Sequence, residues 1–127
     1  MDVSEQTTRR ILIVDDDYGI RDSLTQIFED EGYDVKSASN GEEAITYLRN
    51  HAVRPHVILL DLMMPIMNGW EFRSAQQQDP ALAIIPVVVI SADRQLSQHA
   101  SVLRANAYLA KPINFATLLD TVEQYCA

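Results

Sequence analysis

Three runs of four consecutive apolar residues constrain the fold of this chain more than any other feature. The runs are Ile11–Val14, Val57–Leu60 and Val87–Ile90, and each lies between polar or turn-forming residues. A run this short and this uniformly apolar is typical of a β-strand that is buried on both faces. Such strands occur in parallel sheets with helices packed on either side. We therefore expect an α/β domain.

Apolar residues recur at helical spacing between and after these runs. The spacing predicts five amphipathic helices at residues 20–28, 44–48, 70–75, 96–103 and 115–122. The third has a thin apolar face because Gln76–Gln78 follows it, and we expect a connection from Asp79 to Pro86. Two shorter segments, Tyr33–Ala38 and Ala107–Ala110, complete an alternation of five strands and five helices. This alternation predicts a doubly wound (βα)5 fold, a five-stranded parallel sheet in three layers.

Charge and composition exclude several classes of protein. The sequence has 18 acidic residues against 10 basic ones, and the formal charge of -8 repels a phosphate backbone, so we expect no direct binding to nucleic acid. No apolar run approaches the length of a membrane span, and the polar leader at residues 1–9 lacks the apolar core of a signal peptide. Cys126 is the single cysteine, so no intrachain disulfide can form. These features predict one cytoplasmic domain over residues 10–127 that does not contact a membrane.

Polar side chains follow four of the predicted strands at their carboxyl ends. They are Asp15, Asp16 and Asp17 after the first strand, Asp61 after the third, Ser91 after the fourth and Lys111 after the fifth. A single acid at such a position is usually a helix cap, and three acids before a helix could simply cap it. In open parallel sheets, however, ligands bind beyond the carboxyl ends of the strands, where the strand order reverses. The recurrence of the pattern in four strands favours one shared site.

The chemistry of these side chains predicts a magnesium site that takes part in phosphoryl transfer. Carboxylates gathered in one cleft repel one another unless a cation lies between them, and Mg²⁺ binds through one or two carboxylates while it keeps several waters. Asp61 would be the nucleophile, since carboxylates form acyl phosphates. The Lys111 ammonium and the Ser91 hydroxyl can contact the oxygens of the transferred group. No Gly-rich phosphate loop is present, which argues against a nucleotide as the direct donor.

The stretches that hold these residues closely resemble the receiver domains of two-component response regulators, the CheY-like family, from about residue 10 to residue 125. The matching stretches are Ile11–Asp17, Leu60–Pro65 with Asn68-Gly69, Ile90–Ala92 and Tyr108–Pro112. The resemblance implies a flavodoxin-like sheet with the strand order 2-1-3-4-5.

The same resemblance implies a role for each acid. Asp61 would accept a phosphoryl group from the phosphohistidine of a sensor histidine kinase or of a phosphotransfer protein. Asp16 and Asp61 would be direct Mg²⁺ ligands, and Asp15 would act mainly through water. Met63 would give only its backbone carbonyl to the metal.

The resemblance also implies a switch. Ser91 would be the switch hydroxyl and Lys111 the phosphate-pairing lysine, and Tyr108 would turn inward when Ser91 engages the phosphoryl group. The surface of the fourth helix, the fifth strand and the last helix would then bind a downstream protein target, with a phosphatase as a further candidate partner. We expect a monomer, or a dimer that forms weakly on phosphorylation.

Two residues depart from the common pattern of this family. Arg104 stands where many relatives have Gly, so the left-handed backbone of the usual turn before the fifth strand is harder to adopt. Asn68 replaces the more frequent Asp and removes one negative charge from its loop. The sequence leaves open whether the peptide bond between Lys111 and Pro112 is cis.

Two other interpretations stay open beside the phosphorylation switch. A phosphohydrolase of the haloacid-dehalogenase type would use Asp15 and Asp17, but Gly19 stands where that class needs a hydroxyl, and no cap domain is available. A receiver-fold interaction module that is never phosphorylated is the other interpretation. We expect a signalling domain and not a turnover enzyme, although the domain would take part in its own phosphorylation and autodephosphorylation.

Overall fold

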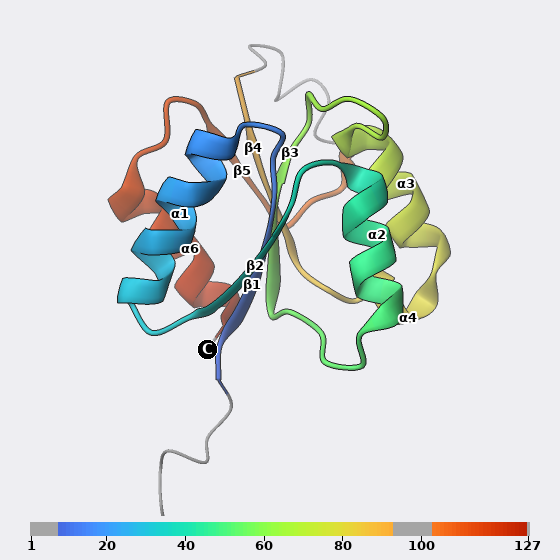
Figure 1. The fold of residues 1–127 in the computed structure, drawn as a ribbon, viewed down its shortest axis with the longest axis horizontal. Helices are drawn as coiled ribbons and strands as arrows, with labels where there is room; N and C mark the ends of the chain where they lie inside the picture. The colour runs from blue at the N-terminus through green and yellow to red at the C-terminus, as the bar shows by residue number, and fades with distance from the viewer. Residues whose placement is uncertain (1–7, 93–102, 127) are drawn as a thin grey trace, which may run out of the picture.

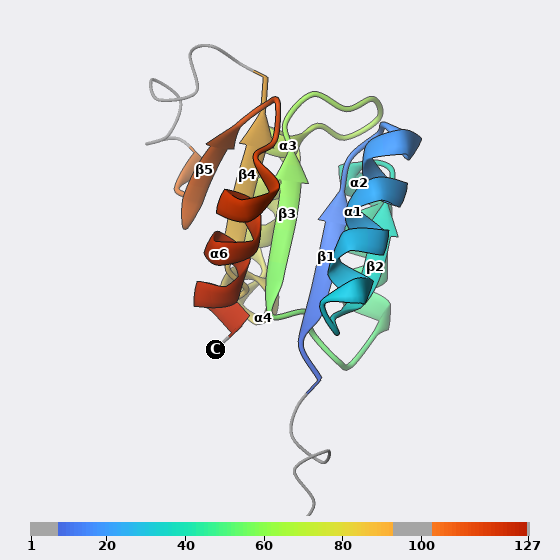
Figure 2. The same ribbon diagram turned by 90° about the vertical axis from the view of Figure 1, so that its left-hand side faces the viewer.

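A computed structural model describes residues 8–92 and 103–126 of the chain. These residues form one five-stranded sheet in which every neighbouring pair of strands is parallel (Figures 1 and 2). The strands are β1 (Arg10–Val14), β2 (Asp34–Ala38), β3 (Val57–Asp61), β4 (Val87–Ser91) and β5 (Ala107–Ala110). Their order across the sheet is β2-β1-β3-β4-β5. The predicted doubly wound fold and its strand order are confirmed.

Helices cover both faces of the sheet. Those in the described part of the chain are α1 (Tyr18–Asp30), α2 (Gly41–Asn50), α3 (Gly69–Gln78), α4 (Pro80–Ala83) and α6 (Phe115–Cys126). The helices α1 and α6 lie on one face, and α2, α3 and α4 lie on the other (Figure 1). The helix predicted at residues 96–103 falls, except for Leu103, outside the described residues.

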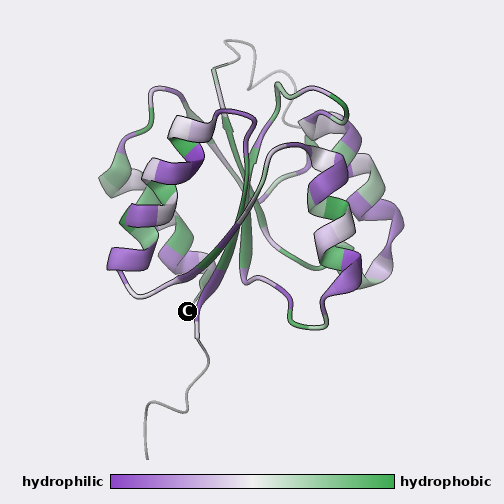
Figure 3. Cartoon of the chain, viewed as in Figure 1, coloured by the Kyte–Doolittle hydropathy of each residue, from purple (hydrophilic) through white to green (hydrophobic). Residues whose placement is uncertain are grey.

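The core forms two layers because successive side chains of a strand point to opposite faces of the sheet. Ile11 and Ile13 of β1 pack on the side of α1 and α6, whereas Leu12 and Val14 pack on the side of α2 and α3. Every residue of β3 and β4 is buried, while β2 has the half-exposed pattern of an edge strand. Figure 3 shows mainly hydrophobic strands between helices that carry both hydrophobic and hydrophilic residues.

Four helices begin at a side-chain cap in the loop that follows a strand. In each case the side-chain oxygen of the cap accepts the backbone N–H three residues further on: Asp17 from Ile20, Asn40 from Glu43, Asn68 from Glu71 and Asn114 from Thr117. Each such cap contributes about 1 kcal/mol. Asp17 therefore has the capping role that an acid before a helix can take. Asn68 also forms a capping box with Glu71, so the residue that departs from the family pattern starts α3.

Two sequence expectations about the connections need correction. The segment from Asp79 to Pro86 contains the short helix α4, which Asp79 caps and which has Pro80 at its first position. Arg104 adopts the left-handed conformation, with φ of 52°, in spite of its side chain. The turn before β5 thus forms without glycine.

The peptide bond between Lys111 and Pro112, which the sequence left open, is cis.

Ile66, in the loop between β3 and α3, provides a test of local backbone strain. It has φ of 69° and a side chain that is 72% exposed. A β-branched residue is disfavoured in this region, whereas Asn tolerates it. We expect Ile66→Asn to raise the free energy of unfolding by about 1 kcal/mol, measured by urea denaturation.

Ile84 is the matched control because it is 81% exposed and has an ordinary φ of -79°. Ile84→Asn should change stability by less than about 0.5 kcal/mol. Equal effects of the two substitutions would show that the backbone at Ile66 stores no strain.

Candidate functional site

The strand register brings two acids from distant parts of the sequence to the same edge of the sheet. Val14 of β1 pairs with Leu60 of β3, so Asp15 and Asp61, the next residue of each chain segment, come level with each other. The backbone N–H of Asp15 also donates to the carbonyl of Ala38 at 3.1 Å, which extends the ladder between β1 and β2 by one bond. The backbone of Asp15 is therefore fixed on the side of β2.

Asp15, Asp16 and Asp61 form one carboxylate cluster. Each offers an oxygen, and the three oxygens lie within 4.8 Å of one another. Asp15 and Asp61 are only 4% and 6% exposed, whereas Asp16 is open to solvent. A set of oxygen donors with one exposed member suits a hard divalent cation that keeps part of its water shell. The residues therefore fit Mg²⁺.

Lys111 lies between the two buried acids. Its Nζ is 3.3 Å from Oδ2 of Asp15 and 3.5 Å from Oδ2 of Asp61. Burial by itself lowers the pKa of Lys111, but the charges of Asp61 and Asp15 outweigh burial and raise the pKa above its usual value. The ammonium group therefore stays protonated and balances part of the negative charge at this edge of the sheet.

The Asp61 carboxyl has a raised pKa. Burial is the largest cause, and the nearby Asp15 raises the pKa further, while Lys111 and the backbone N–H groups of Met63 and Leu62 lower it. The N–H of Met63 lies at a long 3.5 Å from Oδ1 of Asp61. The negative charge of Asp61 is thus only partly compensated in the folded protein. The uncompensated charge favours binding of a further cation.

Gly69 lets the amino end of α3 approach this site. Its N–H donates to the carbonyl of Leu62 at 2.9 Å. A Cβ atom at Gly69 would lie 2.6 Å from the carbonyl oxygen of Asp61, closer than real side chains allow. Gly69 enters the sequence predictions only as part of the Asn68-Gly69 pair of the family match, and its packing role was not predicted. The Asn-Gly pair was the only signal, and it indicates a turn without saying what approaches it.

Ser91 and Tyr108 lie at different distances from the carboxylates along the sheet. Ser91 is the fully buried last residue of β4, one residue beyond Ile90, which pairs with Asp61. The hydroxyl of Tyr108 instead accepts the backbone N–H of Ala105 at 2.8 Å, at the amino end of β5. The sheet therefore brings Ser91 next to the strand of Asp61. The hydroxyl of Tyr108 is directed instead toward the amino end of β5, away from the carboxylates.

Met63 is the last predicted site residue. It follows Asp61 by two positions, and its side chain is 65% exposed, so it adds no polar side chain to the cluster. Of the predicted residues, Asp15, Asp16, Asp61 and Lys111 are therefore the ones whose side chains the fold gathers directly.

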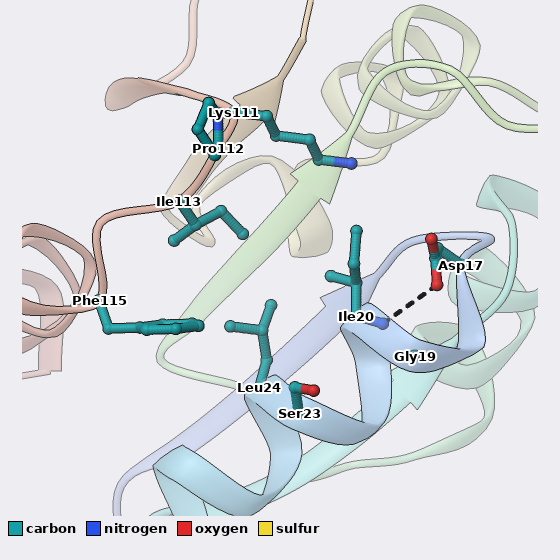
Figure 4. Close-up of a pocket in the computed structure, with 9 residues that line it drawn as sticks. All are labelled: Asp17, Gly19, Ile20, Ser23, Leu24, Lys111, Pro112, Ile113 and Phe115. Carbon is teal, nitrogen blue, oxygen red and sulfur yellow. Dashed lines mark hydrogen bonds between the residues drawn. The ribbon is translucent and has the colours of Figure 1, made fainter.

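An apolar pocket of about 510 Å³ lies beside Lys111 (Figure 4). Ile20 and Leu24 of α1 form one wall, and Ile113 and Phe115, from the segment after β5, form the other. Phe115 is 45% exposed although it is aromatic. Lys111 lines this pocket and also contacts Asp15, so the pocket borders the carboxylate cluster.

The fold and this cluster define a known class of signalling domain. A family model described as the response regulator receiver domain matches residues 11–123. The chain belongs to the response regulator receiver domain family. Proteins of this family are signalling domains of two-component systems, interact with histidine kinases or phosphotransfer proteins, and bind Mg²⁺ at a cluster of aspartates.

Individual relatives match nearly the whole chain. Sporulation initiation phosphotransferase F of Bacillus subtilis is 32% identical over 116 residues, which cover 91% of this chain and 92% of that protein. The structure of the chemotaxis response regulator CheY4 of Vibrio cholerae has a TM-score of 0.83 at 30% identity, with coverage of 94% and 99%. The response regulator TrrA of Thermotoga maritima, in complex with Mg²⁺-BeF, has a TM-score of 0.82 at 28% identity and coverage of 93% and 99%.

None of the helices in the described part of the chain has the length and apolar content that a membrane crossing requires.

The raised pKa of Asp61 predicts that Asp61→Asn stabilises the metal-free protein at pH 7. The folded state favours the protonated carboxyl, so the ionised form costs stability at neutral pH, and this cost disappears as pH falls below the unfolded value of 3.8. In EDTA at pH 7, the substitution should raise Tm by a few degrees, and the gain should shrink as pH is lowered toward 4.

The exposed carboxylate of Asp22 on α1 provides the control, and Asp22→Asn should leave Tm nearly unchanged. A lower Tm for Asp61→Asn at pH 7 would mean that the contact with Lys111 outweighs burial and the repulsion from Asp15.

Proposed function

We propose that this chain is the phosphoacceptor receiver of a two-component or phosphorelay system and that Asp61 accepts the phosphoryl group. The observation that carries the proposal is the position of Asp61, a buried carboxylate within 4.8 Å of two other acids and 3.5 Å from the Lys111 ammonium. A carboxylate held in this way is available as a nucleophile that forms an acyl phosphate.

In the transfer step, an Asp61 oxygen forms a bond to the phosphorus of a phosphohistidine, and the bond from phosphorus to the imidazole nitrogen breaks. The imidazole leaves with the electron pair of that bond. Lys111 favours the ionised form of Asp61 before transfer and can pair with a phosphoryl oxygen afterwards, because its Nζ lies 3.5 Å from Oδ2 of Asp61. A small hydroxyl such as that of Ser91 can donate to another phosphoryl oxygen.

The acids beside Asp61 would hold the metal ion. Asp15, Asp16 and Asp61, with the backbone carbonyl of Met63, are the groups we assign to Mg²⁺. When bound, Mg²⁺ supplies positive charge that stabilises the oxygens of the transferred group. The buried Asp15 is itself fixed by the backbone N–H of Asp17, which donates to its Oδ1 at 2.9 Å. This bond holds one of the proposed ligand side chains in place.

Ser91 and Tyr108 form the switch in this proposal. Phosphorylation offers the buried Ser91 hydroxyl a phosphoryl oxygen as acceptor, and Tyr108 then turns inward from its position on Ala105. The change is a shift in population between two packings. It alters the surface that β5 and α6 form with the helix predicted at residues 96–103. This surface would bind a downstream target or a phosphatase. The protein would be a monomer, or a dimer that forms weakly on phosphorylation.

The donor protein would contact the apolar pocket beside Lys111. Lys111 borders both the pocket and the carboxylate cluster, so a partner that brings a phosphohistidine to Asp61 would reach the pocket in the same encounter. Ile113 and the exposed Phe115 would supply apolar contact area. We place this exchange in the cytoplasm.

The competing phosphohydrolase interpretation loses support at Asp17. That interpretation needs the acid two residues after Asp15 as a catalytic group, but the Asp17 side chain accepts the N–H of Ile20 at 3.1 Å as the cap of α1. Phosphorylation by a small phosphodonor distinguishes the proposed function from an interaction module that is never phosphorylated.

Incubation with acetyl phosphate and Mg²⁺ should add one phosphoryl group to Asp61. The reaction is followed by intact mass, and peptide mapping locates the group. Asp61→Asn should abolish the addition, whereas Asp34→Asn on the edge strand β2 should leave it unchanged. A protein that gains no mass would be the silent interaction module, and a phosphoryl group on another residue would refute the assignment of Asp61.

Mg²⁺ should stabilise the protein through the carboxylate cluster. At ten times the dissociation constant, a ligand that binds only the folded state adds about 1.4 kcal/mol to the free energy of unfolding. Asp16→Asn should lose most of this gain, because Asp16 belongs to the cluster. Asp17→Asn removes the same charge one residue later and keeps a capping side chain, so it should retain the gain. Equal losses in both variants would indicate only a general effect of negative charge.

A further inference from the structure

Arg73 is a buried arginine on α3 that bonds mainly to backbone carbonyls. It is 6% exposed, and among the described residues no carboxylate forms an ion pair with it. Its Nε donates to the carbonyl of Leu103 at 2.8 Å, and its Nη2 donates to the carbonyl of Arg104 at 2.8 Å. A planar guanidinium can hold two acceptors in one fixed geometry, which a lysine cannot do. Arg73 therefore clamps two consecutive residues of the turn before β5.

Gln76, one helical turn further along α3, supports Arg73. Its Oε1 accepts a hydrogen bond from Nη1 of Arg73 at 2.6 Å. Its Nε2 donates to the carbonyls of Leu82 and Ile85, at 2.9 and 3.1 Å. No buried side-chain polar atom in the described part of the chain is left without a partner. The two side chains thus form a satisfied network that joins α3 to the turn before β5 and to the segment around α4.

The turn that Arg73 clamps contains the left-handed residue Arg104. With φ of 52°, Arg104 holds a conformation that glycine adopts more easily. The two carbonyls that accept from Arg73 belong to this residue and to its predecessor, Leu103. Rotation of the backbone at Arg104 toward an ordinary φ would carry its carbonyl away from the guanidinium. Arg73 therefore opposes the relaxation of this turn.

The same turn holds the hydroxyl of Tyr108. Ala105, the residue after Arg104, donates its N–H to the Tyr108 hydroxyl at 2.8 Å. Burial is the main effect on the pKa of Arg73 and lowers it, but Tyr108 lies close enough to act in the opposite direction. Arg73 and Tyr108 thus meet around one short segment of backbone.

We propose that Arg73 is a positioning residue that keeps the turn Leu103–Ala105 in the shape that holds Tyr108 in its resting position. This inference rests on the proposed function, in which Tyr108 is the moving part of the switch. If the guanidinium is lost, the turn relaxes and the N–H of Ala105 leaves the Tyr108 hydroxyl. The resting packing is then less favoured, and the population shifts toward the switched packing without phosphorylation.

The test follows the ring signal of Tyr108 by NMR in protein labelled at tyrosine, assigned with Tyr108→Phe. The wild-type protein with and without Mg²⁺ and beryllofluoride defines the switched and resting positions of the signal. Arg73→Met should move the signal of the unliganded protein toward the switched position. Adding Arg104→Gly to this variant should move the signal back, because glycine holds the left-handed turn without a clamp.

Arg54 provides a matched control for the loss of a guanidinium. It also donates to backbone carbonyls, those of Leu48 and His51 at the end of α2. Arg54→Met should lower stability but leave the Tyr108 signal at its resting position. If Arg73→Met does not fold, the comparison uses Arg73→Lys, which keeps the positive charge but cannot hold both carbonyls in one fixed geometry.

The outcomes separate this inference from the proposed function. A Tyr108 signal that stays in the resting position after loss of Arg73, or that Arg54→Met moves equally, overturns the role of Arg73. A wild-type signal that does not respond to Mg²⁺ and beryllofluoride refutes the switch itself. In that case the unliganded variants still show whether Arg73 fixes the position of Tyr108.

Discussion

The site of this receiver domain depends on two buried carboxylates that share one ammonium group. Asp15 and Asp61 repel each other, and burial makes their charges more costly, yet a single lysine, Lys111, lies within 3.5 Å of both. One positive charge cannot balance two buried carboxylates and the exposed Asp16. The remaining negative charge is what makes this edge of the sheet suited to a divalent cation.

The fold is arranged so that this pair can exist. Only a sheet in which β1 and β3 are neighbours brings Asp15 level with Asp61, and only a parallel β5 beyond β4 brings Lys111 to the same edge. Apolar strands buried on both faces hold these ends rigidly, and Gly69 lets α3 begin against the backbone of Asp61. The chemistry of the site thus rests on ordinary packing of strands and helices.

Much of this could be predicted from the sequence because buried strands and amphipathic helices leave regular patterns. The acids at the strand ends were visible for the same reason, whereas the strand order came from the family resemblance. Gln76 was misinterpreted as weakening α3, although it is fully buried. A periodic pattern cannot show that a polar side chain is satisfied by carbonyls from other segments, and for the same reason it could not show how Arg73 supports the left-handed Arg104.

The most direct test is a crystal structure of the protein grown with Mg²⁺ and beryllofluoride. We expect beryllofluoride on the Asp61 carboxylate, one metal ion held by the neighbouring acids, and Lys111 in contact with a fluoride. Beryllofluoride at another residue, or a metal ion bound away from Asp15 and Asp16, would contradict the assignment of this cluster as the phosphoryl site.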